Sequence, residues 1–300
     1  MASKVFAPAK INLALHVTGR RDDGYHLLDT LVSFAPVGDW LTISDAETLS
    51  LTVEGPEAAG VPTDMTNLAM KAAALLAGRR GARMVLDKRL PAASGIGGGS
   101  ADAAAALRGM AAPALDADAL LRAHADGILG LGADVPMCLA SKPLRVRGIG
   151  EGLEPVALPD IPAVLVNPRR PVSTPAVFKA MTRRENTALP EVLPALPDAD
   201  ALIAFLRGTR NDLEAPARAV EPVISAVLDA LSAQAGCGLS RMSGSGATCF
   251  GLFTSEDDAR AASRAIAKAN PAWWVASGVL GDQSGAAMPR LCESEEARAQ

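Results

Sequence analysis

The sequence predicts an α+β protein of two domains. It has 300 residues, about twice the length of a typical ~150-residue domain. Strand-like and helix-like segments are mixed along it without the regular spacing of a doubly wound parallel sheet. Hydrophobic residues make up 49% and charged residues 21%, which is typical of a globular chain and excludes a disordered one.

The charge balance argues against two classes of partner. Lysine and arginine total 29, aspartate and glutamate total 33, and the formal net charge is −4. Such a chain has no general attraction for nucleic acid or an anionic membrane. No apolar run approaches the ~18 residues of a membrane helix, and Lys10 interrupts any secretory leader. The cysteines are scattered without a C-x-x-C pair, so we expect a reduced, cytoplasmic protein without a zinc site.

The first half begins with a strand at 5–17 that has two different faces. From Ile11 to Val17 the odd positions are apolar, whereas Lys10, Asn12 and His16 share the opposite face, as expected of a half-buried strand. The other strands of this half are predicted from their β-like composition, and the helices from helix-forming runs that end near glycine. They are strands at 27–34, 39–44, 49–53 and 82–86, helices at 67–76, 101–112 and from about 116, and an apolar stretch at 128–140.

The character of the chain changes near residue 156. Pro155, Pro159 and Pro162 flank a strand-like stretch, and we place a domain boundary there. The second half predicts strands at 163–166, 247–253 and 273–280, and helices at 175–181, 200–206, 213–219, 221–235 and 256–269. The last dozen residues are polar, and we expect them to fray. Whether the final strand rejoins the first domain stays open.

The densest glycine cluster lies directly before an alanine-rich helix. Ser94-Gly-Ile-Gly-Gly-Gly-Ser100 offers backbone N–H groups where the helix dipole adds positive potential. A flexible turn is the alternative, but it needs only one or two glycines. The loop lacks the Gly-Lys-Ser/Thr of a Walker A motif and the third glycine of the dinucleotide fingerprint, and the chain lacks protein-kinase and G-x-S-x-G signatures. The sequence therefore predicts a phosphate-binding loop of another kind.

Two ionisable residues stand alone in apolar surroundings. Asp134 is the only charged residue between Asp126 and Lys142, and Lys10 is similarly isolated on its strand. Asp134 is also consistent with a helix N-cap followed by Pro136, and Lys10 with a lysine that snorkels from a strand edge. Together they suit a paired, partly desolvated site, so the residues alone leave both interpretations open.

Seven segments, in family order, resemble known kinases. Three resemble motifs of the galactokinase, homoserine kinase, mevalonate kinase and phosphomevalonate kinase (GHMP kinase) superfamily: Ala7-Pro-Ala-Lys-Ile-Asn-Leu13, the glycine cluster within 91–104, and Ser243-Gly-Ser-Gly-Ala-Thr248. Four resemble the 4-diphosphocytidyl-2-C-methyl-D-erythritol kinase family: Gly24-Tyr-His26, 131–136, 211–214 and the Thr174-Pro-x-x-Phe178 spacing. The resemblance runs from about residue 4 to 280, nearly the whole chain.

The resemblance implies a fold and an activity. The fold is the two-domain α+β GHMP kinase fold, with a ribosomal-protein-like ATP-binding domain at 1–156, a ferredoxin-like substrate-binding domain at 157–300 and the active site in the cleft between them. The activity is ATP-dependent phosphorylation of the 2-hydroxyl of 4-diphosphocytidyl-2-C-methyl-D-erythritol, in the non-mevalonate route to isopentenyl diphosphate. The partner is thus a small molecule with a cytidine diphosphate group, and we expect a monomer or a weak homodimer.

The resemblance also assigns site residues. It makes Lys10 and Asp134 catalytic. It implies that ATP contacts two groups of residues. The glycine loop contributes Pro91, Ser94, Gly95, Ile96, Gly97, Gly98, Gly99, Ser100 and Ala101. The adenine side contributes Asn67, Leu68 and Lys88. ATP chemistry implies Mg²⁺. Because Ala101 stands where the family often has a second serine, any hydroxyl contact to the metal falls to Ser100.

The acceptor side has its own set of residues. The resemblance implies that Tyr25 and Phe178 sandwich cytosine, that His26 bonds the base edge, and that Asn12 and Thr174 contact the acceptor. Two of these residues have a plain alternative. Tyr25 is consistent with a loop anchor and Phe178 with a core stripe. On the adenine side the alternatives are a helix N-cap for Asn67, a core leucine for Leu68 and a surface charge for Lys88. Asn211 and Glu214 are equally consistent with a capping box and receive no binding role.

Three other functions compete with this interpretation. A GHMP kinase for another alcohol, such as mevalonate or homoserine, would have no base to stack against Tyr25 and Phe178. A catalytically dead nucleotide-binding module would not need both Lys10 and Asp134. RNA binding is argued against by the acidic balance and by the lack of a basic stripe.

Overall fold

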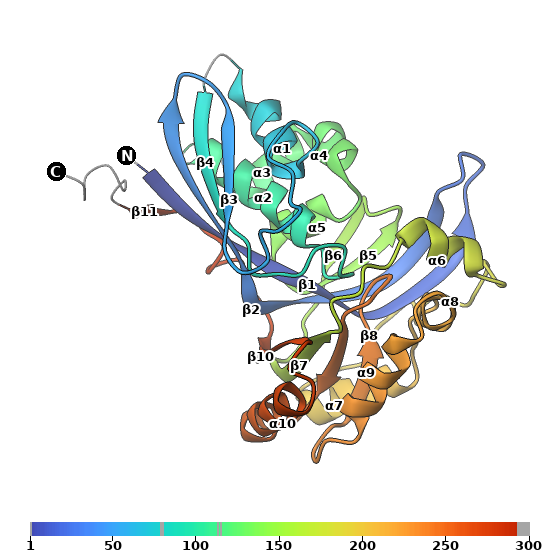
Figure 1. The fold of residues 1–300 in the computed structure, drawn as a ribbon. Coiled ribbons are helices and arrows are strands. Elements are labelled where there is room, and N and C mark those ends of the chain that lie inside the picture. Colours follow the sequence, from blue (N-terminus) through green and yellow to red (C-terminus); the bar gives the residue numbers. More distant parts are fainter. Residues whose placement is uncertain (1, 79–80, 113, 115, 293–300) are drawn as a thin grey trace.

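The computed structural model describes residues 2–78, 81–112, 114 and 116–292, and it contains two β-sheets with helices packed against them (Figure 1). The strands are β1 (Ala2–Arg20), β2 (His26–Ala46), β3 (Ser50–Glu54), β4 (Gly81–Asp87), β5 (Leu144–Gly148), β6 (Gly152–Pro155), β7 (Ile161–Asn167), β8 (Leu239–Met242), β9 (Cys249–Leu252), β10 (Trp274–Leu280) and β11 (Arg290–Cys292). The helices are α1 (Leu68–Ala77), α2 (Gly98–Ala111), α3 (Ala117–Ala123), α4 (Ala125–Leu131), α5 (Val135–Ala140), α6 (Thr174–Ala180), α7 (Ala199–Arg207), α8 (Glu214–Val220), α9 (Val223–Ser232) and α10 (Glu256–Ala269). In the described ranges no helix combines the length and apolarity that a membrane crossing requires.

A long antiparallel hairpin, β1–β2, runs through the first sheet (Figure 1). β2 also pairs with β5 through its first half and with β4 through its second half. The strands predicted at 27–34 and 39–44 are therefore one strand, and their separation was wrong. The pairs Pro8↔Gly38 and Lys10↔Phe34 are joined through a β-bulge that contains Pro36, and proline is tolerated at bulges because it need not donate to the ladder there. The Pro-Val-Gly run is thus a bend within a strand.

Helices α1 to α5 gather on one face of the first sheet, with α2 in their middle (Figure 1). Five alanines of α2 are fully buried: Ala101, Ala103, Ala104, Ala105 and Ala106. Small side chains allow close approach of α2 to the sheet. At Gly109 even an added Cβ would overlap Ile43. The alanine-rich composition of this helix therefore reflects tight packing of the segment that follows the glycine loop.

The second sheet has the order β10-β7-β9-β8 and lies between two layers. Along β7, Val164 and Val166 pack in the same core cluster as residues of α9 and α10. The alternate residues Ala163 and Leu165 share a cluster with Ile11 of β1 and with residues of α7. Because both faces are covered, β7 is buried along its whole length. β1 thus belongs to the cores on both sides of the molecule.

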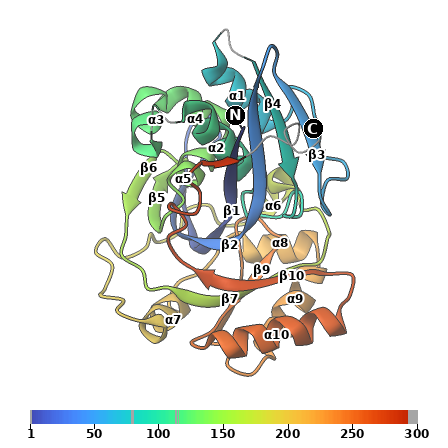
Figure 2. The same ribbon diagram turned by 90° about the vertical axis from the view of Figure 1, so that its left-hand side faces the viewer.

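The chain returns to the first sheet at its end (Figure 2). β10 pairs with β7, whereas β11 pairs antiparallel with β1, from Ala2↔Cys292 to Lys4↔Arg290. The expected fraying was therefore wrong for residues 290–292, and residues 293–300 lie outside the described part of the chain. The strands β5, β6, β8 and β11 were not predicted. The proposed boundary at residue 156 falls between β6 and β7, and it stays a prediction.

Candidate active site

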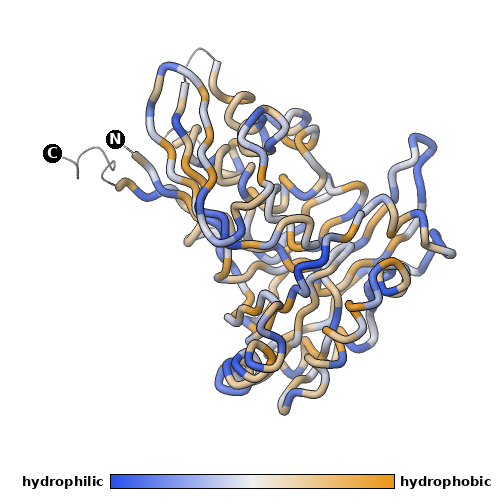
Figure 3. Tube along the Cα trace, viewed as in Figure 1, coloured by the Kyte–Doolittle hydropathy of each residue, from blue (hydrophilic) through white to orange (hydrophobic). Residues whose placement is uncertain are grey.

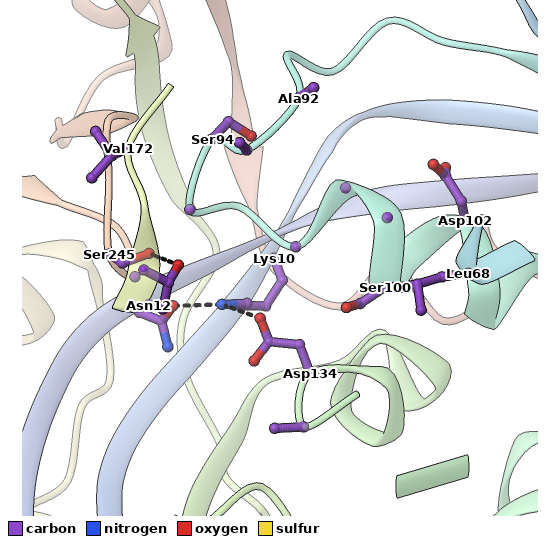
Figure 4. Close-up of a pocket in the computed structure, with 18 of the residues that line it drawn as sticks. Lys10, Asn12, Leu68, Ala92, Ser94, Ser100, Asp102, Asp134, Val172 and Ser245 are labelled. Carbon is purple, nitrogen blue, oxygen red and sulfur yellow. Dashed lines mark hydrogen bonds and ion pairs between the residues drawn. The ribbon is translucent and has the colours of Figure 1, made fainter. Parts of the chain in front are cut away.

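A cavity of about 660 Å³ lies where the two halves of the chain meet (Figure 4). Fifteen of the predicted residues line it: Lys10, Asn12, Asn67, Leu68, Lys88, Pro91, Ser94, Gly95, Gly97, Gly98, Gly99, Ser100, Asp134, Thr174 and Phe178. Ile96 of the loop and Ala101 of the following helix are fully buried and are not among the lining residues. Tyr25 and His26 lie outside this lining.

The glycine loop gives the N-terminus of α2 an uncapped end. α2 begins at Gly98, so the predicted start at Ala101 was wrong and Gly98, Gly99 and Ser100 form its first turn. The N-cap is Gly97, at φ +67°, and no side chain caps the helix. First-turn N–H groups have no acceptor within their own helix. The residues of this turn line the cavity at the positive end of the helix dipole, which is an arrangement that favours binding of a phosphate group.

The loop at 243–248 holds the glycine loop in place. Oγ of Ser243 donates to the carbonyl of Gly95 at 3.1 Å and accepts from the N–H of Asn12 at 3.1 Å. The N–H of Thr248 donates to the carbonyl of Ser94 at 3.1 Å. Gly95 has φ +76°, and a Cβ on it would lie 2.5 Å from the carbonyl oxygen of Ser243. Glycine is therefore required at position 95 both for its φ and for this close approach.

Asn211 helps to hold the loop at 243–248. Its Nδ2 donates to the carbonyls of Met242 and Gly244, each at 2.8 Å, and its Oδ1 accepts from the N–H of Leu213 at 2.9 Å. Oε2 of Glu214 accepts from the N–H of Met242 at 3.0 Å. The segment 211–214 thus holds the loop at 243–248, which in turn holds the glycine loop. A simple capping box would make no such contacts.

Lys10 and Asp134 form an ion pair inside the cavity (Figure 4). Nζ of Lys10 lies 3.0 Å from Oδ2 of Asp134 and donates to Oδ1 of Asn12 at 2.6 Å. Asp134 occupies the N-cap position of α5, but its side chain makes no capping bond. The Lys10 side chain is 3% exposed and that of Asp134 38% exposed. The capping and snorkelling interpretations are therefore wrong for these side chains: the cation is enclosed and the anion faces the cavity.

Arg108, which sequence reasoning missed, anchors the helix that carries Asp134. Nη1 donates to the carbonyls of Cys138 and Leu139 at the end of α5, each at 3.1 Å, and Nη2 donates to the carbonyl of Phe6 at 3.0 Å. Burial lowers the pKa of Arg108 to about 10, so it remains cationic at neutral pH. Burial and the nearby Asp134 raise the pKa of the Cys138 thiol, which keeps it protonated. An arginine inside an alanine-rich helix was the available signal.

Two of the predicted acceptor residues have fixed orientations. Nδ2 of Asn12 donates to Oγ1 of Thr30 at 2.8 Å while its Oδ1 accepts from Lys10. Thr174 is the first residue of α6, and its Oγ1 lies 2.7 Å from Oγ of Ser245. Both residues line the cavity, and they come from opposite halves of the chain.

The predicted base-binding residues are only partly assembled. The ring of His26 stacks on that of Phe178, with centroids 4.4 Å apart and an interplanar angle of 18°. Tyr25 is 59% exposed at the β1–β2 turn, a hydrophilic tip in Figure 3, so it is not tucked against the core. Nε2 of His26 is buried and, among the described residues, has no hydrogen-bond partner. Burial, Arg20 and Arg184 lower the pKa of His26, which favours the neutral imidazole.

The expected adenine side contains a buried charge cluster. Nζ of Lys88 donates to Asp39 and, at 2.7 Å, to Oδ2 of Asp102. Lys88 is 4% exposed, so the surface-charge interpretation was wrong. Burial opposes the charge on Lys88, but the two carboxylates outweigh it and raise its pKa. Burial, together with Asp39, raises the pKa of Asp102 to about 7. This cluster lies behind the first turn of α2, where a Cβ on Gly98 would meet Nζ at 3.2 Å.

Asn67 is fully engaged in holding the local backbone. Its side chain accepts from the N–H of Ala69 at 2.8 Å, and its Nδ2 donates to the carbonyl of Pro62 at 2.7 Å. Asn67 is therefore the N-cap of α1, as one interpretation predicted. Leu68, the first residue of α1, lines the cavity. Asn67 and Leu68 thus form part of the cavity wall.

The described residues contain no cluster of three or more histidine, cysteine or acidic side chains that could hold a metal ion. Magnesium needs no such cluster, because it is usually bound by one or two protein oxygens together with phosphate oxygens and water. The hydroxyl of Ser100 and the exposed carboxylate of Asp134 both line the cavity (Figure 4). The donor set therefore fits a magnesium ion that arrives with a nucleotide.

Family models match both halves of the chain. The model of the GHMP kinases N terminal domain matches residues 67–142, and that of the GHMP kinases C terminal matches residues 192–272. Together with the uncapped glycine loop and the Lys10–Asp134 pair, they define a kinase of the GHMP class. The α+β prediction is confirmed, and the fold is the GHMP kinase fold.

Relatives narrow the class. A 4-diphosphocytidyl-2-C-methyl-D-erythritol kinase of Roseobacter denitrificans is 52% identical over 289 residues, 96% of this chain and 97% of that protein. One of Paracoccus denitrificans is 57% identical over 275 residues, 91% of this chain and 95% of that protein. A crystal structure of a 4-(cytidine 5'-diphospho)-2C-methyl-D-erythritol kinase aligns with TM-score 0.71 and 39% identity, over 93% and 99% of the two chains. The chain belongs to the 4-diphosphocytidyl-2-C-methyl-D-erythritol kinase family.

Proposed function

We propose that this chain phosphorylates the 2-hydroxyl of 4-diphosphocytidyl-2-C-methyl-D-erythritol with ATP, and that Lys10 and Asp134 are its catalytic residues. The observation that carries the assignment of these residues is their 3.0 Å ion pair, which lies in a cavity that the open N-terminus of α2 also lines. A phosphate bound to the amides of the first turn would place its terminal group near this pair.

The exposed carboxylate of Asp134 orients the acceptor. Phosphoryl transfer proceeds through a loose transition state, so positioning and charge neutralisation supply most of the acceleration. A carboxylate is a far weaker base than an alkoxide, so it does not deprotonate an alcohol before the transfer begins. Asp134 therefore holds the hydroxyl in line and accepts its proton late in the transfer.

The enclosed ammonium of Lys10 has two tasks. It holds the Asp134 carboxylate in one orientation, because Asn12 fixes Nζ of Lys10 from the other side. It also offsets the negative charge that develops around the transferred group. Since Lys10 is 3% exposed, this charge acts in surroundings where water screens it little.

Magnesium enters this proposal as a companion of ATP. The hydroxyl of Ser100 would hold it together with phosphate oxygens and water, and it would supply positive charge to the phosphate oxygens. The glycine loop, Asn67, Leu68 and Lys88 would form the nucleotide side of the site. We further propose that the enzyme works in the cytoplasm, as a monomer or a weak homodimer, without nucleic acid as a partner.

The cytidine group would bind at the end of the cavity that contains Phe178. His26 now covers one face of the Phe178 ring, so a base that stacks on that face must displace the imidazole toward the edge of the base. Nε2 of His26 is buried and has no hydrogen-bond partner within the described part of the chain, so it is suited to such an edge contact. Tyr25, exposed on its turn, would close over the other face of the base.

The test is product formation with a panel of alcohols. The purified chain is incubated with Mg²⁺ and ATP plus 4-diphosphocytidyl-2-C-methyl-D-erythritol, its 4-phosphate without cytidine, mevalonate or homoserine. ADP release and the mass of the product are then measured. We expect efficient phosphorylation of the cytidyl substrate alone. Comparable turnover of mevalonate or homoserine would contradict the assigned acceptor, and ADP release from none of the four would contradict the activity.

A further inference from the structure

An ion pair joins the two halves of the chain beside the expected adenine side of the cavity. Nη2 of Arg169, which follows β7, lies 2.6 Å from Oε1 of Glu57, which follows β3. The Glu57 side chain is 10% exposed and that of Arg169 47% exposed. The pair therefore connects the loop at 55–66, on the side of the first sheet, with the segment at 168–173, on the side of the second.

Both segments continue into the cavity wall. The loop at 55–66 contributes Gly60, Val61 and Pro62 to it, and the segment at 168–173 contributes Val172. The carbonyl of Pro62 accepts from Nδ2 of Asn67 at 2.7 Å, so the loop is tied to the cap of α1. Movement of the loop would therefore change the wall on the side where we place adenine.

Each partner of the ion pair is supported by its own half of the chain. The N–H of Glu57 donates to the carbonyl of Lys88 at 3.0 Å. The N–H of Arg169 donates to Oδ1 of Asn167 at 2.7 Å, and Nδ2 of Asn167 donates to Oγ1 of Thr248 at 2.9 Å. The pair thus joins the backbone at Lys88 to the loop at 243–248, which holds the glycine loop in place.

Two details indicate that the ion pair between Arg169 and Glu57 is a specific contact. Arg169 has φ +54°, a left-handed conformation that is unfavourable for arginine. Oε1 of Glu57 is buried and accepts no well-formed hydrogen bond from the described residues. The guanidinium of Arg169 is therefore the charge that compensates this carboxylate.

We propose that Arg169 and Glu57 are a positioning pair for the nucleotide, which fixes the loop at 55–66 so that the adenine side of the cavity is preformed. This rests on the proposed function in one respect, that this end of the cavity takes ATP. Neither side chain lines the cavity, so the pair acts on nucleotide affinity and leaves phosphoryl transfer unchanged. Preforming a site raises affinity by lowering the ordering cost of binding.

The test replaces Arg169 with a residue that suits its backbone. Asparagine tolerates the left-handed region, so Arg169→Asn removes the guanidinium without adding strain. We expect the dissociation constant of Mg·ADP, measured by calorimetry without the alcohol, to rise about fivefold, or about 1 kcal/mol. The KM for ATP should rise in parallel, whereas kcat and the KM for the alcohol stay within about twofold. The matched control is Arg170→Asn, because Arg170 is 66% exposed and lies 3.7 Å from Glu221.

A double-mutant cycle identifies the partner. Glu57→Gln alone should weaken Mg·ADP binding by a similar factor, and the double variant should be no weaker than the worse single variant. Unchanged affinity in Arg169→Asn overturns the proposal, and so do additive losses, because Arg169 would then act on the nucleotide without Glu57. Failure of the wild-type protein to bind Mg·ADP is a separate outcome, which overturns the proposed function and this inference with it.

Discussion

The ammonium of Lys10 and the carboxylate of Asp134 lie 3.0 Å apart but differ in their contact with solvent, since the lysine side chain is 3% exposed and the aspartate 38%. The buried partner is held by a strand and by Asn12, and the exposed partner lies at the N-terminus of a short helix. The pair is therefore a fixed cation with a reachable anion. This asymmetry leads to the first prediction.

Asp134→Ala should reduce kcat by about a thousandfold, because the acceptor hydroxyl loses both its orientation and its proton acceptor. The KM for ATP should stay within a few-fold, since the glycine loop is untouched. Steady-state kinetics with each substrate varied in turn measures both. Asp126→Ala, at an exposed position of α4, is the control. Turnover that survives in Asp134→Ala would remove this residue from the mechanism.

Tyr25→Ala should raise the KM for the cytidyl substrate by roughly tenfold, as stacking of a base on an aromatic ring contributes ~1–3 kcal/mol. The KM for ATP should hardly change. Because Tyr25 is 59% exposed, the melting temperature of the variant should match that of the wild type. Equal effects on the two KM values would refute the stacking role.

Gly95→Ala should destabilise the fold by about 2 kcal/mol or more, since an alanine there would combine an unfavourable φ with a clash. The clash is with the carbonyl of Ser243, 2.5 Å from the added Cβ. Gly99→Ala is the matched change in the same loop, because its Cβ would meet only Leu68 at 3.7 Å. Urea unfolding compares the two variants. The close packing of the two loops is contradicted if both lose the same stability.

The stability of the protein should decrease below about pH 6.5 because of His16. Its side chain is buried, Nδ1 lies 2.9 Å from the carbonyl of Thr187, and Nε2 accepts from the N–H of Arg210 at 3.3 Å. Burial and the charge of Arg210 lower the pKa of His16, although the hydrogen bond to the Thr187 carbonyl and the charges of Asp212 and Asp29 oppose this. Below the unfolded pKa of ~6.5 the imidazole binds a proton more readily in the unfolded chain than in the folded one. The contribution of His16 to the free energy of unfolding is therefore fully present above this pH and is lost as the pH falls.

Urea unfolding at pH 7.5 and 5.5 measures this effect. The wild type should lose up to about 1.4 kcal/mol more than His16→Gln between the two pH values. His124→Gln, at the end of α3, is the control and should retain the wild-type dependence. The assignment to His16 is wrong if both variants follow the wild type.

Much of the fold could be predicted because its signals are local. The alternation around Lys10 predicts β1, and the glycine cluster followed by alanines predicts α2 to within three residues at its start. The isolation of Lys10 and Asp134 in apolar sequence indicated a pair, and they do form one. These features depend on residues close together in sequence.

The missed features depend on residues that are distant in sequence. β11 is three residues long and is defined by pairing with β1, so no local pattern distinguishes it from a tail. Asp39 and Lys88 each have an ordinary sequence setting, and only the fold buries them together. The same holds for Glu57 and Arg169. The gap expected between the strands at 27–34 and 39–44 is a bulge that contains Pro36, and no local pattern distinguishes such a bulge from a turn.

The participation of β1 in the cores of both halves restricts how the molecule can be divided. Leu15 and Val17 pack with residues of the second sheet and its helices, while Val5 and Ala7 pack under the first. A fragment cut near residue 156 would leave each piece with apolar surface that its missing counterpart normally covers. After limited proteolysis near residue 156, the two pieces should therefore either stay associated as a nicked protein or precipitate. Neither piece should remain folded on its own.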